Sequence, residues 1–91
     1  MKTIEEARKD YMETIKVRAR WWLRQKNLSE KEKIEGVIFS FYSIIDGVVD
    51  NLPPLNLTIE SDIDDKENEY QNGMCINGSV YLHNIKGCNE L

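Results

Sequence analysis

The first third of the chain repeats apolar residues at the three- and four-residue spacing of an amphipathic α-helix. Thr3 and Glu6 form a capping-box pair, in which each side chain accepts a hydrogen bond from the backbone of the other, so a helix is expected to begin here. The apolar positions share one stripe of this helix: Ile4, Tyr11, Ile15 and Trp22, flanked by Ala7, Met12, Ala19 and Leu23. The pattern predicts an amphipathic helix within residues 1–26.

A second helical pattern follows after a short polar break. Ser29 and Glu32 repeat the capping-box pair, and the apolar stripe beyond them is wide: Ile34, Val37, Ile38, Phe41, Ile45 and Val48. Gly47 can end the helix in a left-handed conformation, and Pro53-Pro54 prevents its continuation. The sequence therefore predicts a buried central helix over residues 29–47, which forms an antiparallel hairpin with the first helix.

The second half of the chain changes to the two-residue alternation of a β-strand. Residues 55–60 alternate leucine and isoleucine with polar side chains, which predicts a half-buried strand. The polar and acidic residues 61–73 are expected to form a surface loop, and residues 74–76 a second short strand.

The last segment, residues 74–91, has two interpretations after its strand. Asn77-Gly78 is typical of a hairpin turn, whereas Ser79 can cap a short helix over residues 80–86 that Gly87 would end. The helix is slightly favoured. The predicted fold class is α+β, with a two-helix antiparallel hairpin packed on a small β-sheet of two or three short strands.

Length and composition narrow the class of protein. With 91 residues the chain is expected to form a single domain, residues 1–91, and 41% hydrophobic with 31% charged residues indicates a globular protein rather than a disordered or fibrous one. The start of the chain lacks the apolar core of a signal peptide, and the uncharged run from Gly36 to Ile45 is too short to span a membrane. These features predict a cytoplasmic protein in which Cys75 and Cys88 are free thiols.

Charge divides unevenly along the chain and suggests an interaction surface. The net charge is −4, but residues 1–35 carry 10 basic and 7 acidic side chains, whereas residues 36–91 carry 2 basic and 9 acidic ones. An outer stripe of the first helix combines basic and apolar side chains: Lys16, Val17, Arg20, Trp21 and Arg24. An exposed tryptophan beside arginines is typical of a protein-interaction hot spot, and the same mixture can bind nucleic acid. Equally, Trp21 can belong to the core, and the cations can simply stabilise the C-terminal end of the helix.

A stripe of small residues runs along the second helix, opposite its apolar stripe. It consists of Gly36, Ser40, Ser43 and Gly47. Small residues at this spacing let another backbone approach closely, as at a dimer interface, but they can also be the exposed side of the helix. The exposed interpretation is slightly favoured, although a glycine inside a helix calls for a packing reason.

Chemistry-bearing residues form no recognisable catalytic or metal motif. His83 is the only histidine, and Cys75, His83 and Cys88 lack the spacing and the fourth ligand of a zinc site. The acidic residues Asp62, Asp64, Asp65, Glu67 and Glu69 do not match a calcium-binding loop. The sequence therefore predicts a protein without catalytic residues, metal or cofactor.

Two segments resemble a family of small bacterial and prophage-borne proteins of unknown function. They are Glu30 to Gly47 (EKEKIEGVIFSFYSIIDG) and Ile76 to His83 (INGSVYLH), which contains a glycine-serine pair followed by adjacent leucine and histidine. The resemblance implies a small intracellular accessory protein and favours the terminal helix. The leading hypothesis is a non-enzymatic interaction module that self-associates or binds a larger protein; the alternative is weak nucleic-acid binding through the basic face of the first helix.

Overall fold

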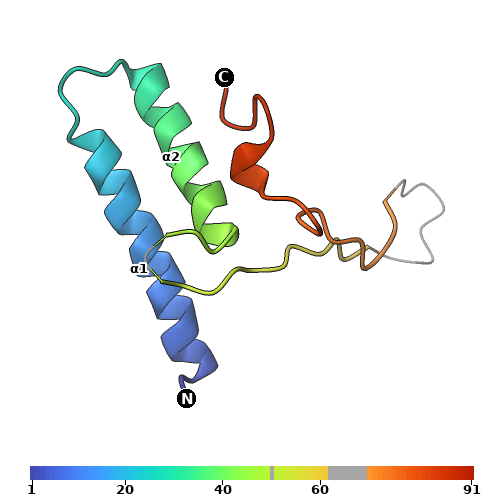
Figure 1. Ribbon diagram of the computed structural model, residues 1–91. Helices are drawn as coiled ribbons and strands as arrows, with labels where there is room; N and C mark the ends of the chain where they lie inside the picture. The colour runs from blue at the N-terminus through green and yellow to red at the C-terminus, as the bar shows by residue number, and fades with distance from the viewer. Residues whose placement is uncertain (50, 62–69) are drawn as a thin grey trace.

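The computed structural model describes residues 1–49, 51–61 and 70–91, and within these ranges it contains two α-helices. Helix α1 spans Ile4–Leu23 and helix α2 spans Glu30–Ile45 (Figure 1). Both predicted capping boxes are confirmed, because Thr3 and Ser29 each accept a hydrogen bond from the backbone of the glutamate three residues later, and that glutamate accepts one in return. The two helices therefore begin where the sequence places them.

Helices α1 and α2 lie side by side and antiparallel, as a hairpin closed by residues 24–29 (Figure 1). Near the closed end of the hairpin, the indole of Trp22 lies on the backbone of Gly36. The indole nitrogen of Trp22 donates a hydrogen bond of 2.9 Å to the hydroxyl of Ser40. Tryptophan on α1 and small residues on α2 thus fix how the two helices face each other.

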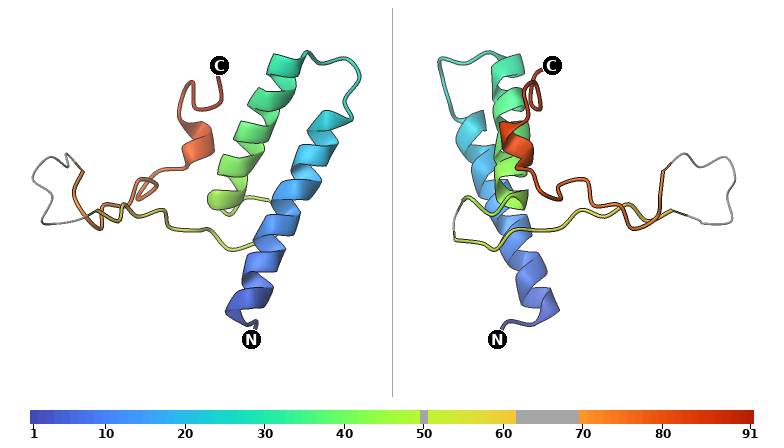
Figure 2. Two further views of the ribbon diagram at one scale, coloured as in Figure 1. Left: turned by 180° about the vertical axis from the view of Figure 1, so that it is seen from behind. Right: turned by 45° about the vertical axis from the view of Figure 1, so that its right-hand side comes forward.

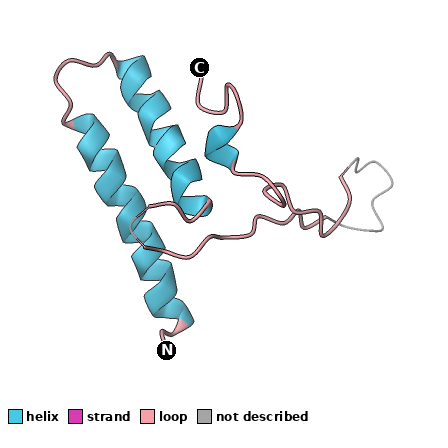
Figure 3. Ribbon diagram, in the orientation of Figure 1, coloured by secondary structure: helices cyan, strands magenta, loops and turns pink. Residues whose placement is uncertain are grey.

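The predicted β-sheet is wrong. Across the described ranges, the secondary structure includes no strand, and residues 55–60 and 74–76 are joined by a single antiparallel bridge between Thr58 and Cys75 (Figure 3). Next to this bridge, the side chain of Asn77 replaces a partner backbone: its oxygen accepts from the Leu57 amide at 2.9 Å, and its nitrogen donates to the Leu55 carbonyl at 2.6 Å. Because the Asn77 side chain occupies these backbone groups, the β-pairing of the two segments ends after one bridge.

The alternating apolar residues of this arm, residues 55–61 and 70–79, also lack a second layer to bury them. Leu55, Met74 and Ile76 are exposed, and the arm extends away from the helices (Figure 1). A two-stranded pairing without a covering layer is marginal in water. The fold is a helical hairpin with an extended arm rather than the expected α+β arrangement.

The C-terminal segment returns to the helices after the arm. It contains a short 3₁₀ helix, η1, at Leu82–Asn84, which lies within the range predicted as a terminal helix but is much shorter. Ser79 does not cap it, because Ser79 has a φ of 66° and the residue before η1 is Tyr81, which makes no side-chain capping bond. Helix α2 lies between α1 and this segment when the molecule is viewed from either side (Figure 2).

The described part of the chain has a small core. Its buried apolar side chains are Ile44, Ile45 and Leu82, and helix α1 has no buried residue. The prediction that the apolar stripe of α2 is buried holds for Ile45 but not for Ile34, Phe41 or Val48, which are exposed. The reason is that α2 directs its small residues toward Trp22, which turns the larger apolar side chains outward. Among the described helices, neither is long and apolar enough to cross a membrane.

Candidate functional site

A groove lined mainly by apolar side chains runs between α1 and α2 on one side of the hairpin. It has a volume of about 360 Å³, and we call it the apolar groove; it is lined by Ala19, Leu23, Ile34, Val37 and Ile38, with Arg20 and Lys33 at its edges. Leu23 is 71% exposed and Ile34 is 52% exposed. One turn further along α2, Phe41 continues the same stripe and is 41% exposed. Large apolar side chains that are contiguous and uncovered are typical of an interaction site.

The other side of the hairpin is covered by the chain itself. The hydroxyl of Tyr11 on α1 donates a hydrogen bond to the carbonyl of Pro53, which holds the segment after α2 against α1. Val49 of this segment lines a cavity of about 220 Å³ together with Arg18 and Trp21. This side of the hairpin is therefore covered in part, whereas the apolar groove marks the side that the described chain leaves open.

The two cations at the edges of the apolar groove contact acceptors of their own chain. Lys33 Nζ donates to the carbonyl of Leu23 at 3.2 Å, and a guanidinium nitrogen of Arg20 lies 3.5 Å from a carboxylate oxygen of Glu13. The first contact joins α2 to the last turn of α1, where free carbonyls favour a cation. Each cation at the groove edge thus has an acceptor within its own chain.

Apart from Arg20, which lies at the groove edge, the interaction surface predicted on α1 lies outside this groove. Lys16, Val17, Arg20 and Arg24 are exposed, and Trp21 is 48% exposed, with its ring packed edge-on against Trp22 at a centroid distance of 4.8 Å. Trp21 is thus neither buried in the core nor fully available for contact with a ligand. The hypotheses that this face binds a protein or nucleic acid stay predictions.

The stripe of small residues is divided between two environments. Gly36, Ser40 and Ser43 are buried, whereas Gly47 is only partly covered and has a φ of 73°. Gly36 and Ser40 contact Trp22, and the Ser43 hydroxyl donates back to the carbonyl of Phe39 at 2.9 Å. These residues pack within one chain, so the stripe is not available to a second molecule.

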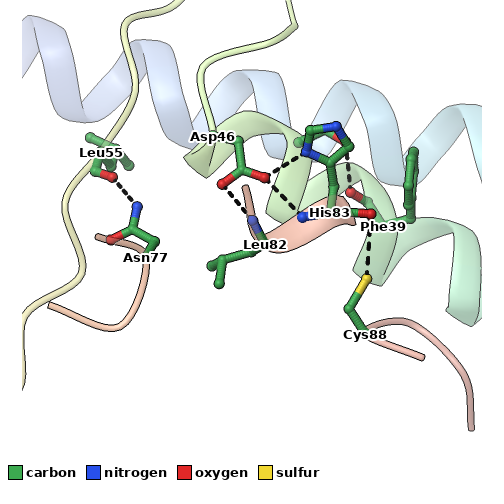
Figure 4. Close-up of polar contacts among 8 residues, drawn as sticks. Phe39, Asp46, Leu55, Asn77, Leu82, His83 and Cys88 are labelled. Carbon is green, nitrogen blue, oxygen red and sulfur yellow. Dashed lines mark hydrogen bonds and ion pairs between the residues drawn. The ribbon is translucent and has the colours of Figure 1, made fainter. Parts of the chain in front are cut away.

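A buried carboxylate connects the end of α2 to the C-terminal segment (Figure 4). Asp46 is 5% exposed and accepts two backbone hydrogen bonds, from the amide of Leu82 at 3.0 Å and from the amide of His83 at 2.8 Å. The Nδ1 atom of His83 lies 2.6 Å from the same carboxylate. Because the first residues of η1 present their free amides to Asp46, the carboxylate acts as a cap supplied from another element.

The surroundings of His83 complete this anchor. The ring packs against Phe39 of α2 and against Tyr81, each at a centroid distance of 5.7 Å, and Cys88 Sγ lies 3.7 Å from the His83 carbonyl oxygen. The pair of Asp46 and His83 was not recognised in the sequence as a contact. The sequence contains one indication that Asp46 is special, because it is the only charged residue between Glu35 and Asp50.

The pKa of Asp46 depends on two opposing effects. Burial raises the pKa of this carboxyl, but the hydrogen bonds from His83 and Leu82, together with the nearby imidazole, outweigh burial and lower the pKa below its usual value. A carboxyl with a lowered folded-state pKa stabilises the fold at pH values above its unfolded-state pKa, which is about 3.9, and this contribution is lost as the pH falls through the folded-state value.

We therefore expect the stability difference between the wild-type protein and Asp46→Asn to be constant near neutral pH and to shrink below about pH 4. Urea unfolding of both proteins at pH 7, 5 and 3 measures this difference. A difference that stays the same down to pH 3 would contradict the role assigned to the ionised carboxylate.

The remaining candidate ligands are not brought together. Among the residues that the structure describes, no three histidine, cysteine, aspartate or glutamate side chains gather as a metal site. Cys75 lies on the arm, where its thiol contacts Asn77, whereas Cys88 and His83 lie beside α2. The acidic residues 62–69 lie outside the described ranges.

Comparison with known proteins returns no family model, no curated protein and no solved structure that matches this chain. The resemblance to prophage-borne proteins stays a prediction. The function is therefore argued from the geometry of the molecule.

Proposed function

We propose that this protein is a non-enzymatic interaction module that binds a protein partner through the apolar groove. The observation that carries the proposal is the exposure of Leu23, Ile34 and Phe41 along one side of the hairpin, while smaller residues occupy the helix contact. Burial of a large apolar side chain contributes about 1.5–3 kcal/mol relative to its exposure, so covering this groove would stabilise a complex substantially.

Two features support this groove over the tryptophan surface as the principal contact. The groove combines residues of both helices, and the hairpin that presents it is fixed by the contact of Trp22 with Gly36 and Ser40. A preformed surface loses little conformational entropy on binding. By contrast, part of the ring surface of Trp21 is already in contact with Trp22.

Site-specific photo-crosslinking in the native host tests the proposal. A photoreactive phenylalanine analogue in place of Phe41 is expected to give one dominant crosslinked protein species. The same analogue in place of Val17 is the matched control, because Val17 is also an exposed apolar residue, 47% exposed, but does not line the groove.

The product at position 41 should disappear when Ile34→Glu is introduced into the same chain, because a charge would then lie in the groove. Equal crosslinking at positions 17 and 41, or no product at position 41, would contradict the proposal.

A further inference from the structure

We infer that the partner covering the apolar groove is a second copy of this chain, so that two hairpins pack groove to groove around a two-fold axis. This inference rests on the proposed function and names its partner. Three observations carry it: the surface area of the single chain, the size of its core, and the contacts made by the cations at the groove edges.

The single chain exposes more surface than a compact monomer of its mass. Its accessible surface is 7442 Å², whereas the scaling relation for folded monomers gives about 5,500 Å² at 10.7 kDa. The radius of gyration is 15.7 Å, compared with about 12 Å for a compact domain of 91 residues. The chain therefore exposes more surface than a compact monomer, and part of this surface can be buried in an interface.

The described parts of the arm extend away from the helices (Figure 2), and large apolar side chains are exposed on the open side of the hairpin. A stable dimer of standard size needs about 800 Å² from each copy, which is less than half of the excess. The open side of the hairpin is formed by two regular helices and is lined mainly by apolar side chains. An interface of that size therefore fits within the excess surface of the chain.

The core explains why association would be advantageous. Within the described residues three apolar side chains are buried, Ile44, Ile45 and Leu82, and none of them belongs to α1. A two-helix hairpin buries one stripe of each helix and leaves the opposite side without a layer. A second hairpin supplies that layer and converts the two pairs into a four-helix arrangement, the usual solution for short antiparallel helices.

The groove edges favour an identical partner over an acidic one. Lys33 is bonded to the Leu23 carbonyl and Arg20 lies beside Glu13, so both edge cations have acceptors within their own chain. A nucleic acid or an acidic peptide would be recognised by cations that are free to reach it. A second copy offers an apolar groove of the same length and composition, and a two-fold contact requires such a self-complementary patch.

Sedimentation equilibrium of the full-length chain between 5 and 200 μM tests the inference. The wild-type protein is expected to show about twice the monomer mass of 10.7 kDa. Ile34→Glu on α2 and Leu23→Glu on α1 should each weaken the dimer at least about 100-fold, because each places a charge in the centre of the interface. Both side chains are exposed in the single chain, so circular dichroism should show unchanged helix content.

Val17→Glu is the matched control, because it adds the same charge to an exposed apolar position outside the groove. It should sediment as the wild type does. A monomeric wild-type protein at 200 μM would overturn the inference, as would a dimer that persists in both groove variants.

The two proposals fail in different ways. A monomeric chain that still crosslinks to a different protein at position 41 overturns the second copy but leaves the interaction module intact. Absence of any product at position 41 overturns the interaction module itself.

Discussion

Replacing Asp46 with asparagine is expected to lower the free energy of unfolding by about 2–3 kcal/mol, because the substitution removes an acceptor from buried hydrogen bonds. The amides of Leu82 and His83 each donate to a different carboxylate oxygen, and the His83 ring contacts one of them. An asparagine keeps one acceptor but presents an amide group where the second acceptor stood, so one buried donor loses its partner. Urea unfolding measures the loss.

The loss should be concentrated at the attachment of the C-terminal segment. Amide hydrogen exchange at Leu82 and His83 is expected to accelerate more than exchange at Ile44, which is buried in α2. Glu60→Gln is the matched control, since it makes the same chemical change at an exposed carboxylate. If Asp46→Asn leaves both the urea midpoint and the exchange of residues 82 and 83 unchanged, Asp46 is not the anchor.

The sequence predicted the helices well because their signals are local. Thr3 with Glu6 and Ser29 with Glu32 define the two starts, and each pair acts within one turn of its own helix. The ends are predicted less closely: α2 ends at Ile45, before the predicted boundary at Gly47. Local backbone chemistry is thus sufficient to predict where these helices begin, and it predicts their ends only approximately.

The orientation of α2 could not be predicted by the same means. Periodicity ranks positions by hydrophobicity, so it assigned Ile34 and Phe41 to the core and the glycine-serine stripe to the outside. In the structure the bulk of Trp22 decides the packing, because its ring needs a surface of small residues, which Gly36 and Ser40 provide. The shape of a partner helix is a tertiary property that a single-helix pattern does not contain.

The sheet prediction failed for a similar reason. Alternation at residues 55–60 records a tendency of the backbone to extend, but a sheet also needs a second layer over its apolar face. The side chain of Asn77 takes the hydrogen bonds of the Leu55 carbonyl and the Leu57 amide that a neighbouring strand would have taken. The interaction site was missed because it consists of the residues assigned to the core: the groove became visible only once α2 was oriented.

Gly36→Ala provides the decisive test of that orientation. A Cβ atom at position 36 would lie 2.4–2.5 Å from three ring atoms of Trp22, which is too close for any real contact, so the indole must shift. Alanine normally stabilises a helix by about 0.5–1 kcal/mol relative to glycine, whereas overpacking of a close contact costs about 1–3 kcal/mol. The variant is therefore expected to be less stable than the wild type by about 1–2 kcal/mol.

The matched control is the same substitution in a Trp22→Leu background, where the rigid ring is absent. There Gly36→Ala should raise the free energy of unfolding, because the helix propensity of alanine is no longer opposed by a clash. The change of sign between the two backgrounds, measured by urea unfolding as a double-mutant cycle, isolates the contact between the two positions. If alanine stabilised both backgrounds equally, Trp22 would not lie on Gly36, the small residues would not hold the helices together, and the apolar stripe of α2 would be free to form the core that its hydrophobicity suggests.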